Sequence, residues 1–473
     1  MKIKIPPVQE RLQLNFRRLG HVIFHNGSSR KSQRQDEETV GATSNDDTDF
    51  PLEKKLYIRG MDSIEICNLL RSIVNLKKSR SEVDLLEQSS KRVEHNEVID
   101  DALDQLTRDL LSEYCSRVKH QVGKWLAKSS CWGQPEKVFF TAENRLATNH
   151  PEDVMYIIQM QMSVAREHLP PKYRPTVMIL MLKEIKKVLN RLAAAILRTE
   201  HNPHTIQILC AIISDCTCMH EQLDHISSED FLCGSDIALS HKLKREMDHV
   251  LQKYLSVAVY SSDKLAGAIM RDVKSIVRKI HTRAWIQGNQ TEVILSTLRD
   301  YFQDIKLWIP PFFFAKFIRQ CLENLRHMYL RSFFSKRNYL QARRVNALTA
   351  SALLQRDRLN ITQFFSSEYV DELKQTGLRT IDDIHQRFEI LRAMSNVLKA
   401  GSNAHDVLDD IKLIVDDLGL RHGKRAIVIL AKKNGNRKNA LNQWKCAVHC
   451  SLGNTVPDFH GDEKTYQNIF QRR

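Results

Sequence analysis

Two short clusters of cysteine and histidine carry the residue types that bind soft metal ions. In the first, "CTCMH", a helical backbone would place Cys216 and His220 on one face and turn Cys218 away from it. In the second, "CAVHC", Cys446 and Cys450 would align on one helical turn. A structural zinc site normally takes four ligands, and neither cluster has a second ligand pair close by in the sequence. The pattern therefore favours buried or incidental thiols over a metal site.

The sequence also lacks the short motifs of common enzyme sites. It has no GxxxxGKS/T phosphate-binding loop, no GxGxxG after a strand, no HExxH zinc motif and no GxSxG nucleophile turn. A catalytic site needs reactive groups that converge, and the motifs that would supply them are missing. We therefore expect no catalytic residues, no cofactor, no metal and no small-molecule substrate, and we interpret the chain as a protein that is not an enzyme.

Two basic clusters are the remaining functional signal. Residues 315–344 hold eight Lys and Arg against one Glu, and "RHGKRAIVILAKKNGNRK" at 421–438 holds seven and no acid. Solvated helix faces explain such clusters in many proteins. The functional alternative is contact with anionic lipid, worth about 1 kcal/mol for each basic residue close to the surface. The residues predicted to make such contacts are Lys336, Arg337, Arg343, Arg344, Arg421, Lys424, Arg425, Lys432 and Lys433.

The stretch "HTRAWIQGNQTEVILSTLRDYFQDI" could be a pocket or a corner between two helices. Trp285 lies at the edge of the apolar stripe that precedes it, so its ring can reach the core. Gly288 suits the left-handed end of one helix, and Asn289 suits the cap of the next. Tyr301 joins the apolar stripe of the second helix, with Phe302 beside it. Because the stretch offers no nucleophile, base or set of phosphate donors, we predict a packed helix corner.

Composition narrows the class of protein. A formal net charge of +15 suits acidic partners, namely nucleic acid, an anionic membrane face or acidic protein surfaces. Signatures of zinc fingers, RRM and KH domains are absent, so nucleic acid is the less favoured partner. No apolar run approaches the ~20 residues that cross a bilayer, and no secretory signal is evident. The scattered cysteines fit reduced thiols in the cytoplasm.

Apolar residues at steps of three and four predict a series of amphipathic helices. Thr380 with Asp383 predicts the cap of a helix that ends at Gly401, and Gly419 predicts the end of the next one. The only strand candidate is the short "KIKI" at the start of the chain. The clearest helical stripe comprises Met178, Leu182, Ile185, Leu189, Leu192 and Ile196. Helices with one apolar face each must stack into bundles, so we predict an all-α fold of consecutive bundles that form an elongated rod.

Changes of composition and pattern divide the chain into seven predicted segments. The start is rich in Lys and Arg, and the stretch after it is acidic and too poor in apolar residues to fold alone. We predict a basic N-terminal segment (1–34), an acidic flexible linker (35–53), an N-terminal helical region (54–130), helical bundles (131–262 and 263–345), a C-terminal helical bundle (346–433) and an irregular tail (434–473).

Three stretches together resemble one known family. "EDVMYIIQMQMSVA", "HNPHTIQILCAIISDCTCMHEQL" and "RAWIQGNQTEVILSTLRDYFQDI" are similar, in this order, to segments of exocyst complex component 3, the Sec-six subunit of the exocyst. The resemblance spans roughly residues 96–430. These are packing motifs, so their specificity lies in their order and number. Members of the family are generally longer, with an N-terminal coiled coil where this chain has its basic start and acidic linker.

The resemblance implies a helical-bundle rod of the type shared by multisubunit tethering complexes. It implies a non-catalytic exocyst subunit that tethers secretory vesicles to the plasma membrane before SNARE-mediated fusion. Its implied partners are other exocyst subunits and SNARE proteins. The basic clusters add the anionic plasma-membrane surface as an expected partner. The implied location is the cytoplasm, with peripheral recruitment to sites of secretion. The alternative from composition is a basic helical scaffold that binds nucleic acid.

Overall fold

The computed structural model describes residues 62–84, 93–129, 134–198, 204–226, 237–334, 346–378, 380–400 and 405–433. Several predictions lie outside these residues: the basic segment 1–34 with its "KIKI" strand, the acidic linker 35–53, the tail 434–473, the second cysteine cluster at 446–450 and the helix end at Gly401. They stay predictions.

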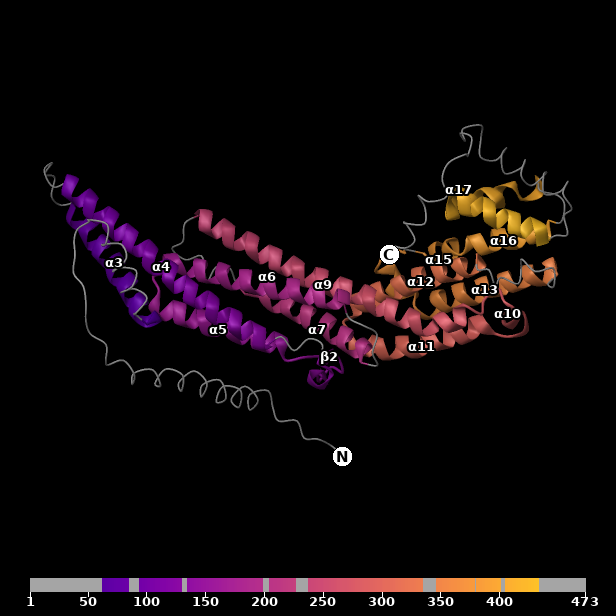
Figure 1. Cartoon of the computed structure of the whole chain (residues 1–473), viewed down its shortest axis with the longest axis horizontal. Helices are drawn as coiled ribbons and strands as arrows, with labels where there is room; N and C mark the ends of the chain where they lie inside the picture. The colour runs from indigo at the N-terminus through magenta and orange to yellow at the C-terminus, as the bar shows by residue number, and fades with distance from the viewer. Residues whose placement is uncertain are drawn as a thin grey trace, which may run out of the picture. The chain divides into compact units, whose positions relative to one another are not determined.

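The described part of the chain is built almost wholly from α-helices that pack on one another (Figure 1), which confirms the all-α prediction. The α-helices are α3 (Ser63–Asp84), α4 (Val93–Ser129), α5 (His150–His168), α6 (Arg174–Arg198), α7 (Thr205–Asp224), α9 (Ile237–Val277), α10 (Arg283–Gln287), α11 (Gln290–Trp308), α12 (Pro311–Phe333), α13 (Ala347–Glu368), α14 (Val370–Lys374), α15 (Ile381–Arg387), α16 (Glu389–Lys399) and α17 (Leu408–Lys433). The 3₁₀-helices are η1 (Pro135–Lys137), η2 (Pro171–Tyr173) and η3 (His405–Val407). None of the described helices is long and apolar enough to cross a membrane.

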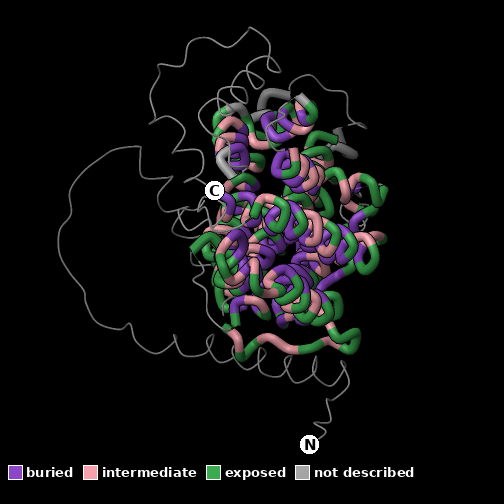
Figure 2. The backbone as a smooth tube through the Cα atoms, turned by 90° about the vertical axis from the view of Figure 1, so that its right-hand side faces the viewer, coloured by how far each residue is buried: buried purple, intermediate pink, exposed green. Residues whose placement is uncertain are grey.

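The predicted apolar stripes are the faces by which the helices pack. All six members of the stripe in α6 are buried. Buried residues lie on the sides of the helices that face one another, and exposed residues lie outside (Figure 2). The buried face of α16 also includes a polar residue, Ser395, whose hydroxyl lies 2.6 Å from that of Ser351 in α13 and is thereby hydrogen-bonded. Helical periodicity therefore identified the packing surfaces correctly.

The longest described helix, α9, joins the earlier helices to the later ones. It spans 41 residues, or about 60 Å at a rise of ~1.5 Å per residue. It packs against α6 and α7, and also against α11 and α12. Helix α9 is continuous through residues 262 and 263, where the sequence predicted a boundary between two bundles. The two predicted bundles thus share this helix, and their division into domains stays a prediction.

A small β-hairpin lies between α4 and α5, where the sequence analysis had predicted no strand. Strands β1 (Phe139–Phe140) and β2 (Leu146–Ala147) pair antiparallel, and Asn144 takes a positive φ of 63° in the turn between them. Leu146 is buried and β2 packs against α7, whereas Phe140 is exposed. The prediction missed this hairpin because strands of two residues are too short to show an alternating pattern.

Two helical stretches are interrupted, one at Phe388 and one at Gly419. The capping box of Thr380 and Asp383 is present at the start of α15, as predicted. However, the helix that follows is broken at Phe388, which separates α15 from α16. Gly419 interrupts α17 with a φ of 75°, and helix resumes directly after it. A Cβ added to Gly423 would lie 2.6 Å from the Cα of Val415.

The approach of residues 415 and 423 shows how sharply the chain bends at residue 419. In a straight helix two residues eight apart are separated by about 12 Å. The observed contact is much closer, so the segment after Gly419 folds back onto the one before it. A left-handed φ at Gly419 permits the bend, and the lack of a side chain at Gly423 permits the close packing.

Candidate functional site

The predicted helix corner contains a buried polar cluster. Nε1 of Trp285 in α10 donates to Oδ2 of Asp357 in α13 at 2.6 Å. The hydroxyl of Tyr329 in α12 donates to the same oxygen at 2.7 Å. The other carboxylate oxygen lies 3.6 Å from Nη2 of Arg356. Burial raises the pKa of Asp357, although the hydrogen bonds from Tyr329 and Trp285 lower it. One carboxyl group thus connects three helices.

His281 completes this cluster from the turn before α10. Its Nδ1 lies 2.8 Å from Oγ of Ser332, and that hydroxyl donates its own proton to the carbonyl oxygen of Tyr329. Since the serine proton is already used, Nδ1 of His281 must be the donor in their contact. Its ring is enclosed edge-on by Trp285, Tyr329 and Phe333. Burial lowers the pKa of His281 to about 3, so the ring is neutral at physiological pH.

Residue types at the corner resemble those of a catalytic site, but their packing does not. The side chains of His281, Trp285 and Asp357 are 0% exposed, and Tyr329 is 1% exposed. A substrate would have to displace core side chains to reach any of them. A reaction site needs space for a reacting atom within reach of the nucleophile and base. The arrangement instead fits a polar cross-link within the helical core.

Details of the corner correct the prediction. Trp285 is buried, as predicted. Gly288 is extended, with φ −140°, so it is not a left-handed helix end; the left-handed residue is His281, with φ 61°. Asn289 does precede α11, but its side chain caps nothing. Phe302, rather than Tyr301, is the fully buried ring of α11.

A second buried cluster fixes the end of the β-hairpin. Asp215 in α7 accepts hydrogen bonds from the backbone nitrogen of Thr148 at 2.9 Å and from its hydroxyl at 2.6 Å. Burial raises the pKa of Asp215 to about 7, against the lowering effect of both hydrogen bonds. The neighbouring His150 contacts the carbonyl oxygen of Ser129 at 3.4 Å, and burial lowers its pKa to about 4. This cluster joins the hairpin to α7 and is also closed to solvent.

The first cysteine cluster, with Cys216 and Cys218, lies in α7. In the part of the chain that the structure describes, no three His, Cys, Asp or Glu side chains are grouped closely enough to hold a metal ion. Cys216 is buried, and burial raises its thiol pKa well above the ordinary range. Burial likewise raises the pKa of the half-buried Cys218 thiol to about 11. In this structure both thiols are therefore protonated at neutral pH.

The predicted lipid-contact residues fall partly within the described structure. Lys336, Arg337, Arg343 and Arg344 lie outside it. The remaining five all belong to the segment of α17 that follows Gly419: Arg421, Lys424, Arg425, Lys432 and Lys433.

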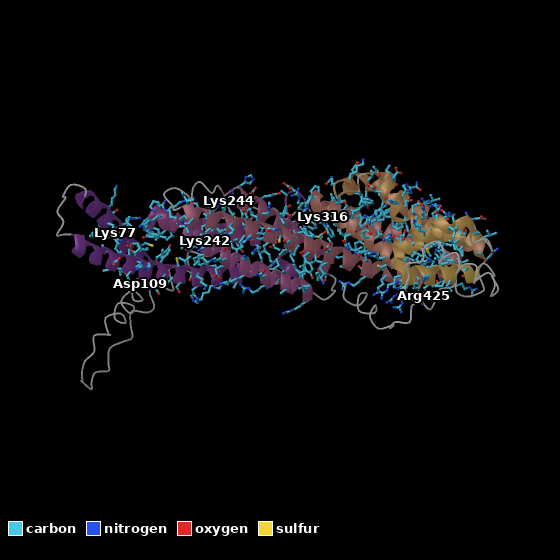
Figure 3. All side chains as sticks on the ribbon, turned by 90° about the horizontal axis from the view of Figure 1, so that it is seen from above. Lys77, Asp109, Lys242, Lys244, Lys316 and Arg425 are labelled. Carbon is cyan, nitrogen blue, oxygen red and sulfur yellow. The ribbon has the colours of Figure 1, made fainter. Side chains whose placement is uncertain are left out.

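Two of these α17 residues are exposed. Arg421 and Arg425 lie on the surface of the helix, and Figure 3 labels Arg425 there. The guanidinium of Arg425 lies 5.7 Å from the ring centre of Phe334. Burial and the neighbouring Arg421 and Arg425 lower the pKa of His422, which disfavours a charge on its ring. The helix segment thus presents a cationic surface.

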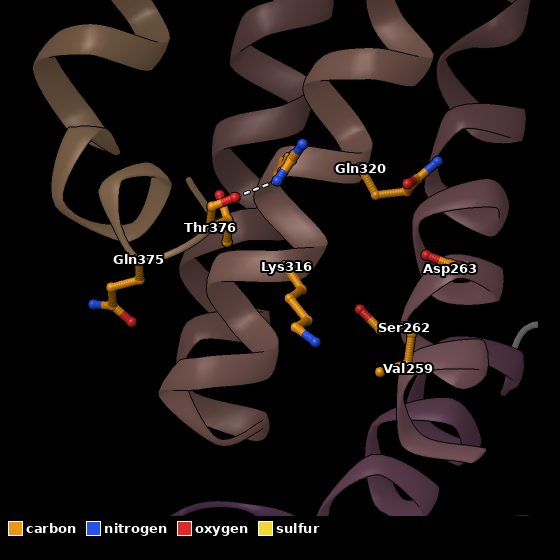
Figure 4. Close-up of a pocket in the computed structure, with 8 residues that line it drawn as sticks. Val259, Ser262, Asp263, Lys316, Gln320, Gln375 and Thr376 are labelled. Carbon is orange, nitrogen blue, oxygen red and sulfur yellow. Dashed lines mark hydrogen bonds between the residues drawn. The ribbon is translucent and has the colours of Figure 1, made fainter. Parts of the chain in front are cut away.

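A pocket that the sequence analysis did not identify opens between α9, α12 and the turn after α14 (Figure 4). Its volume is about 360 Å³, near the lower end of the roughly 300–1,000 Å³ of small-molecule pockets. The residues that line it are Val259, Ser262, Asp263, Lys316, Arg319, Gln320, Gln375 and Thr376. Arg319 donates to the carbonyl oxygen of Thr376 and so ties α12 to that turn.

No signal in the sequence could have found the pocket or the partners of Trp285. The polar residues of the pocket come from helices far apart in the chain, and each has the composition of an ordinary solvated face. Asp357 occurs in "LLQRDRLNI", where a charged residue gives no hint of burial. Only the tertiary fold brings these groups together.

Known proteins resemble this chain over most of its described length. The family model of exocyst complex component Sec6 matches residues 80–415, which include both buried clusters and the pocket. A crystal structure of the C-terminal domain of the exocyst subunit Sec6p is similar with a TM-score of 0.57 and 15% identity, over 75% of this chain and 95% of that one. A crystal structure of M-Sec gives a TM-score of 0.48 at 14% identity, over 75% and 57% of the two chains.

Proposed function

The chain belongs to the exocyst complex component Sec6 family, and we propose that it is a non-catalytic exocyst subunit that tethers secretory vesicles to the plasma membrane before SNARE-mediated fusion. The observation that carries this proposal is the family match over residues 80–415. The likeness to the Sec6p C-terminal domain supports the same helical-bundle fold. Nothing in the match favours the alternative of a nucleic-acid scaffold.

The chemistry of the interior supports a structural role. The two clusters with catalytic residue types, around Asp357 and around Asp215, are both enclosed by packed helices. Their carboxyl groups accept hydrogen bonds from other elements and so hold those elements together. A protein of this kind acts through its exterior, where assembly partners bind.

The proposed partners are other exocyst subunits, SNARE proteins and the anionic face of the plasma membrane. The proposed location is the cytoplasm, with recruitment to sites of secretion. The cationic surface of α17 supports membrane contact through Arg421, Lys424 and Arg425, since each basic residue close to an anionic surface contributes about 1 kcal/mol. Lys336, Arg337, Arg343, Arg344, Lys432 and Lys433 remain proposed members of the same contact.

Affinity purification of the tagged endogenous protein tests this function. Other exocyst subunits should co-purify with it in stable proportion, and nuclease treatment should leave their recovery unchanged. Depletion of the protein should impair polarised secretion. Cells that express the tag alone are the control. Recovery of the protein without any exocyst subunit would contradict the proposal, and nuclease-sensitive recovery of nucleic acid in their place would favour the basic scaffold.

A further inference from the structure

The pocket between α9 and α12 contains two cationic side chains that form no ion pair within the described structure. Lys316 and Arg319 both line it, and among the described residues neither forms an ion pair. The carboxyl group of Asp263 lies across from Lys316 (Figure 4), near enough for the ammonium to lower its pKa against the larger raising effect of burial. The three groups leave one net positive charge in the pocket.

A buried hydroxyl that lines the pocket also lacks a hydrogen-bond partner among the described residues. Ser262 is 2% exposed, and its Oγ forms no hydrogen bond within the described structure. Figure 4 shows this oxygen directed toward the side of Lys316. A buried polar atom without a hydrogen bond destabilises the folded state. A ligand that brings an acceptor oxygen into the pocket would recover part of this cost.

An exposed aromatic ring stands at the edge of the same site. The Nζ of Lys316 lies 4.5 Å from the ring centre of Phe312, which is 52% exposed at the start of α12. The ring of Phe312 packs edge-on against the buried ring of Phe313, with 5.3 Å between the ring centres, and this contact restricts its position. Fixed aromatic rings are frequent anchors of protein interfaces. Lys316 therefore connects a polar pocket to an apolar contact point.

We propose that this pocket, together with Phe312, binds a short segment of a partner protein that carries an Asp or Glu beside a large apolar side chain. The acid pairs with Lys316 and Arg319, and the apolar side chain packs on Phe312. The inference rests on the proposed function, because a subunit of an assembly must hold segments of other chains. It adds the location of one such surface and the chemistry of its partner.

The charge balance favours a carboxylate over a phosphate. A carboxylate carries one negative charge, which matches the single net positive charge of the pocket. A phosphate group carries about −1.5 to −2 at neutral pH, and Asp263 would repel the excess. The concave site also suits a protruding side chain better than a flat membrane surface. We therefore assign the pocket to an acidic peptide rather than to a lipid head group.

Fluorescence anisotropy with the purified full chain tests the proposal. The probe is a labelled peptide of alternating Leu and Glu pairs, and its counterpart has Gln in place of Glu. The wild type should bind the Glu peptide and should bind the Gln peptide much more weakly. Lys316→Glu should weaken binding of the Glu peptide roughly tenfold, which corresponds to about 1.4 kcal/mol. Phe312→Ser should weaken it by a smaller factor.

Two further variants complete the test: one is expected to strengthen binding, and the other is a control. Asp263→Asn should strengthen binding of the Glu peptide severalfold, because it removes the repelling charge. Lys242→Glu carries the same charge reversal on the exposed face of α9 (Figure 3) and should bind as the wild type does. Circular dichroism shows whether each variant is folded. Equal weakening by Lys242→Glu and Lys316→Glu, or equal binding of the Glu and Gln peptides, would overturn the proposal.

The source of the ligand and the proposed function are tested separately. If Lys316→Glu weakens binding to phosphatidylserine vesicles and leaves peptide binding unchanged, the site is a lipid contact and the proposal is wrong. Recovery of exocyst subunits with the wild-type chain tests the function itself. If the subunits co-purify and the peptide does not bind, the inference fails while the function stands. If one exocyst subunit no longer co-purifies with the Lys316→Glu variant but still co-purifies with Lys242→Glu, the inference is supported within the assembly.

Discussion

The indole nitrogen Nε1 of Trp285 lies 2.6 Å from Oδ2 of Asp357, and this hydrogen bond joins α10 to α13 across 72 residues of sequence. The same oxygen accepts the hydroxyl of Tyr329 from α12. Three helices that are distant in the chain therefore meet at one carboxyl group. Because every member is buried, the loss of any one leaves a polar partner without water to replace it.

Substitution of Trp285 should separate the contribution of its ring from that of its hydrogen bond. Trp285→Ala removes both and should lower the free energy of unfolding by ~3–5 kcal/mol. Trp285→Phe keeps an aromatic ring and removes the N–H, so a smaller loss of ~1–3 kcal/mol is expected. Urea denaturation followed by circular dichroism measures both losses. An unchanged denaturation midpoint for Trp285→Ala would show that the helix corner is not part of the packed core.

Asp215 should make the stability of the protein depend on pH. Burial raises its pKa in the folded state to about 7, whereas an unfolded chain has an Asp pKa of about 3.9. The folded state thus holds the proton more tightly, so this contribution to stability is fully present below about pH 4 and is lost as the pH rises to about 7. Its full size is on the order of 4 kcal/mol.

Comparison with Asp215→Asn isolates this effect. Asn keeps an oxygen that can accept the backbone N–H of Thr148 and has no proton to lose in this range. The variant should gain melting temperature relative to the wild type as the pH is raised from 5 to 8. The difference between the two proteins also cancels the opposite contribution of His150, whose lowered pKa costs stability as the pH falls. A constant difference across this range would contradict the assignment.

Two glycine substitutions should act in opposite directions. A Cβ at Gly423 would meet the Cα of Val415 at 2.6 Å, so Gly423→Ala should destabilise by ~1–3 kcal/mol through overpacking. A Cβ at Gly267, within α9, would have nothing within 4 Å. Gly267→Ala should therefore stabilise by ~0.5–1 kcal/mol, because alanine loses less backbone entropy in a helix. Thermal melts of the two variants test the bend in α17, and a gain in stability at Gly423 would argue against it.

Removal of charge from α17 should weaken contact with anionic membranes. The double variant Arg421→Gln with Arg425→Gln should lose about 2 kcal/mol of affinity for phosphatidylserine vesicles, or about thirtyfold. Vesicle sedimentation at fixed salt measures this loss. The matched control is Lys183→Gln with Lys242→Gln, two exposed residues on α6 and α9. Equal losses in both double variants would show a general effect of net charge and remove the special role of α17.

The sequence predicted those features that depend on local pattern. The stripe of α6 and the capping box at Thr380 follow from spacing within one helix, and both are confirmed. Features set by tertiary contacts were missed or misplaced. Tyr301 and Phe302 both lie near the apolar face of α11, and Phe302 is the buried one because it packs against rings such as Phe317 and Tyr369 from other elements.

The candidate site was less predictable than the fold. The basic residues of α17 were visible as a run of charge, whereas the pocket at Lys316 depends on α9 and α12 lying side by side. The partner of Trp285 lies 72 residues away, beyond the reach of any periodicity. Residue spacing carries information about one helix or strand at a time, so it does not reveal groups that converge from several elements.

Helix α9 has one further consequence. Its backbone runs without interruption from residue 237 to 277 and packs against α6 and α7 as well as α11 and α12. Helix α9 therefore contains no break at which α6 and α7 could unfold while α11 and α12 stayed folded. If heat or denaturant unfolds one of these pairs, it also disrupts the backbone hydrogen bonds of α9, on which the other pair packs. The helices around α9 should therefore unfold together.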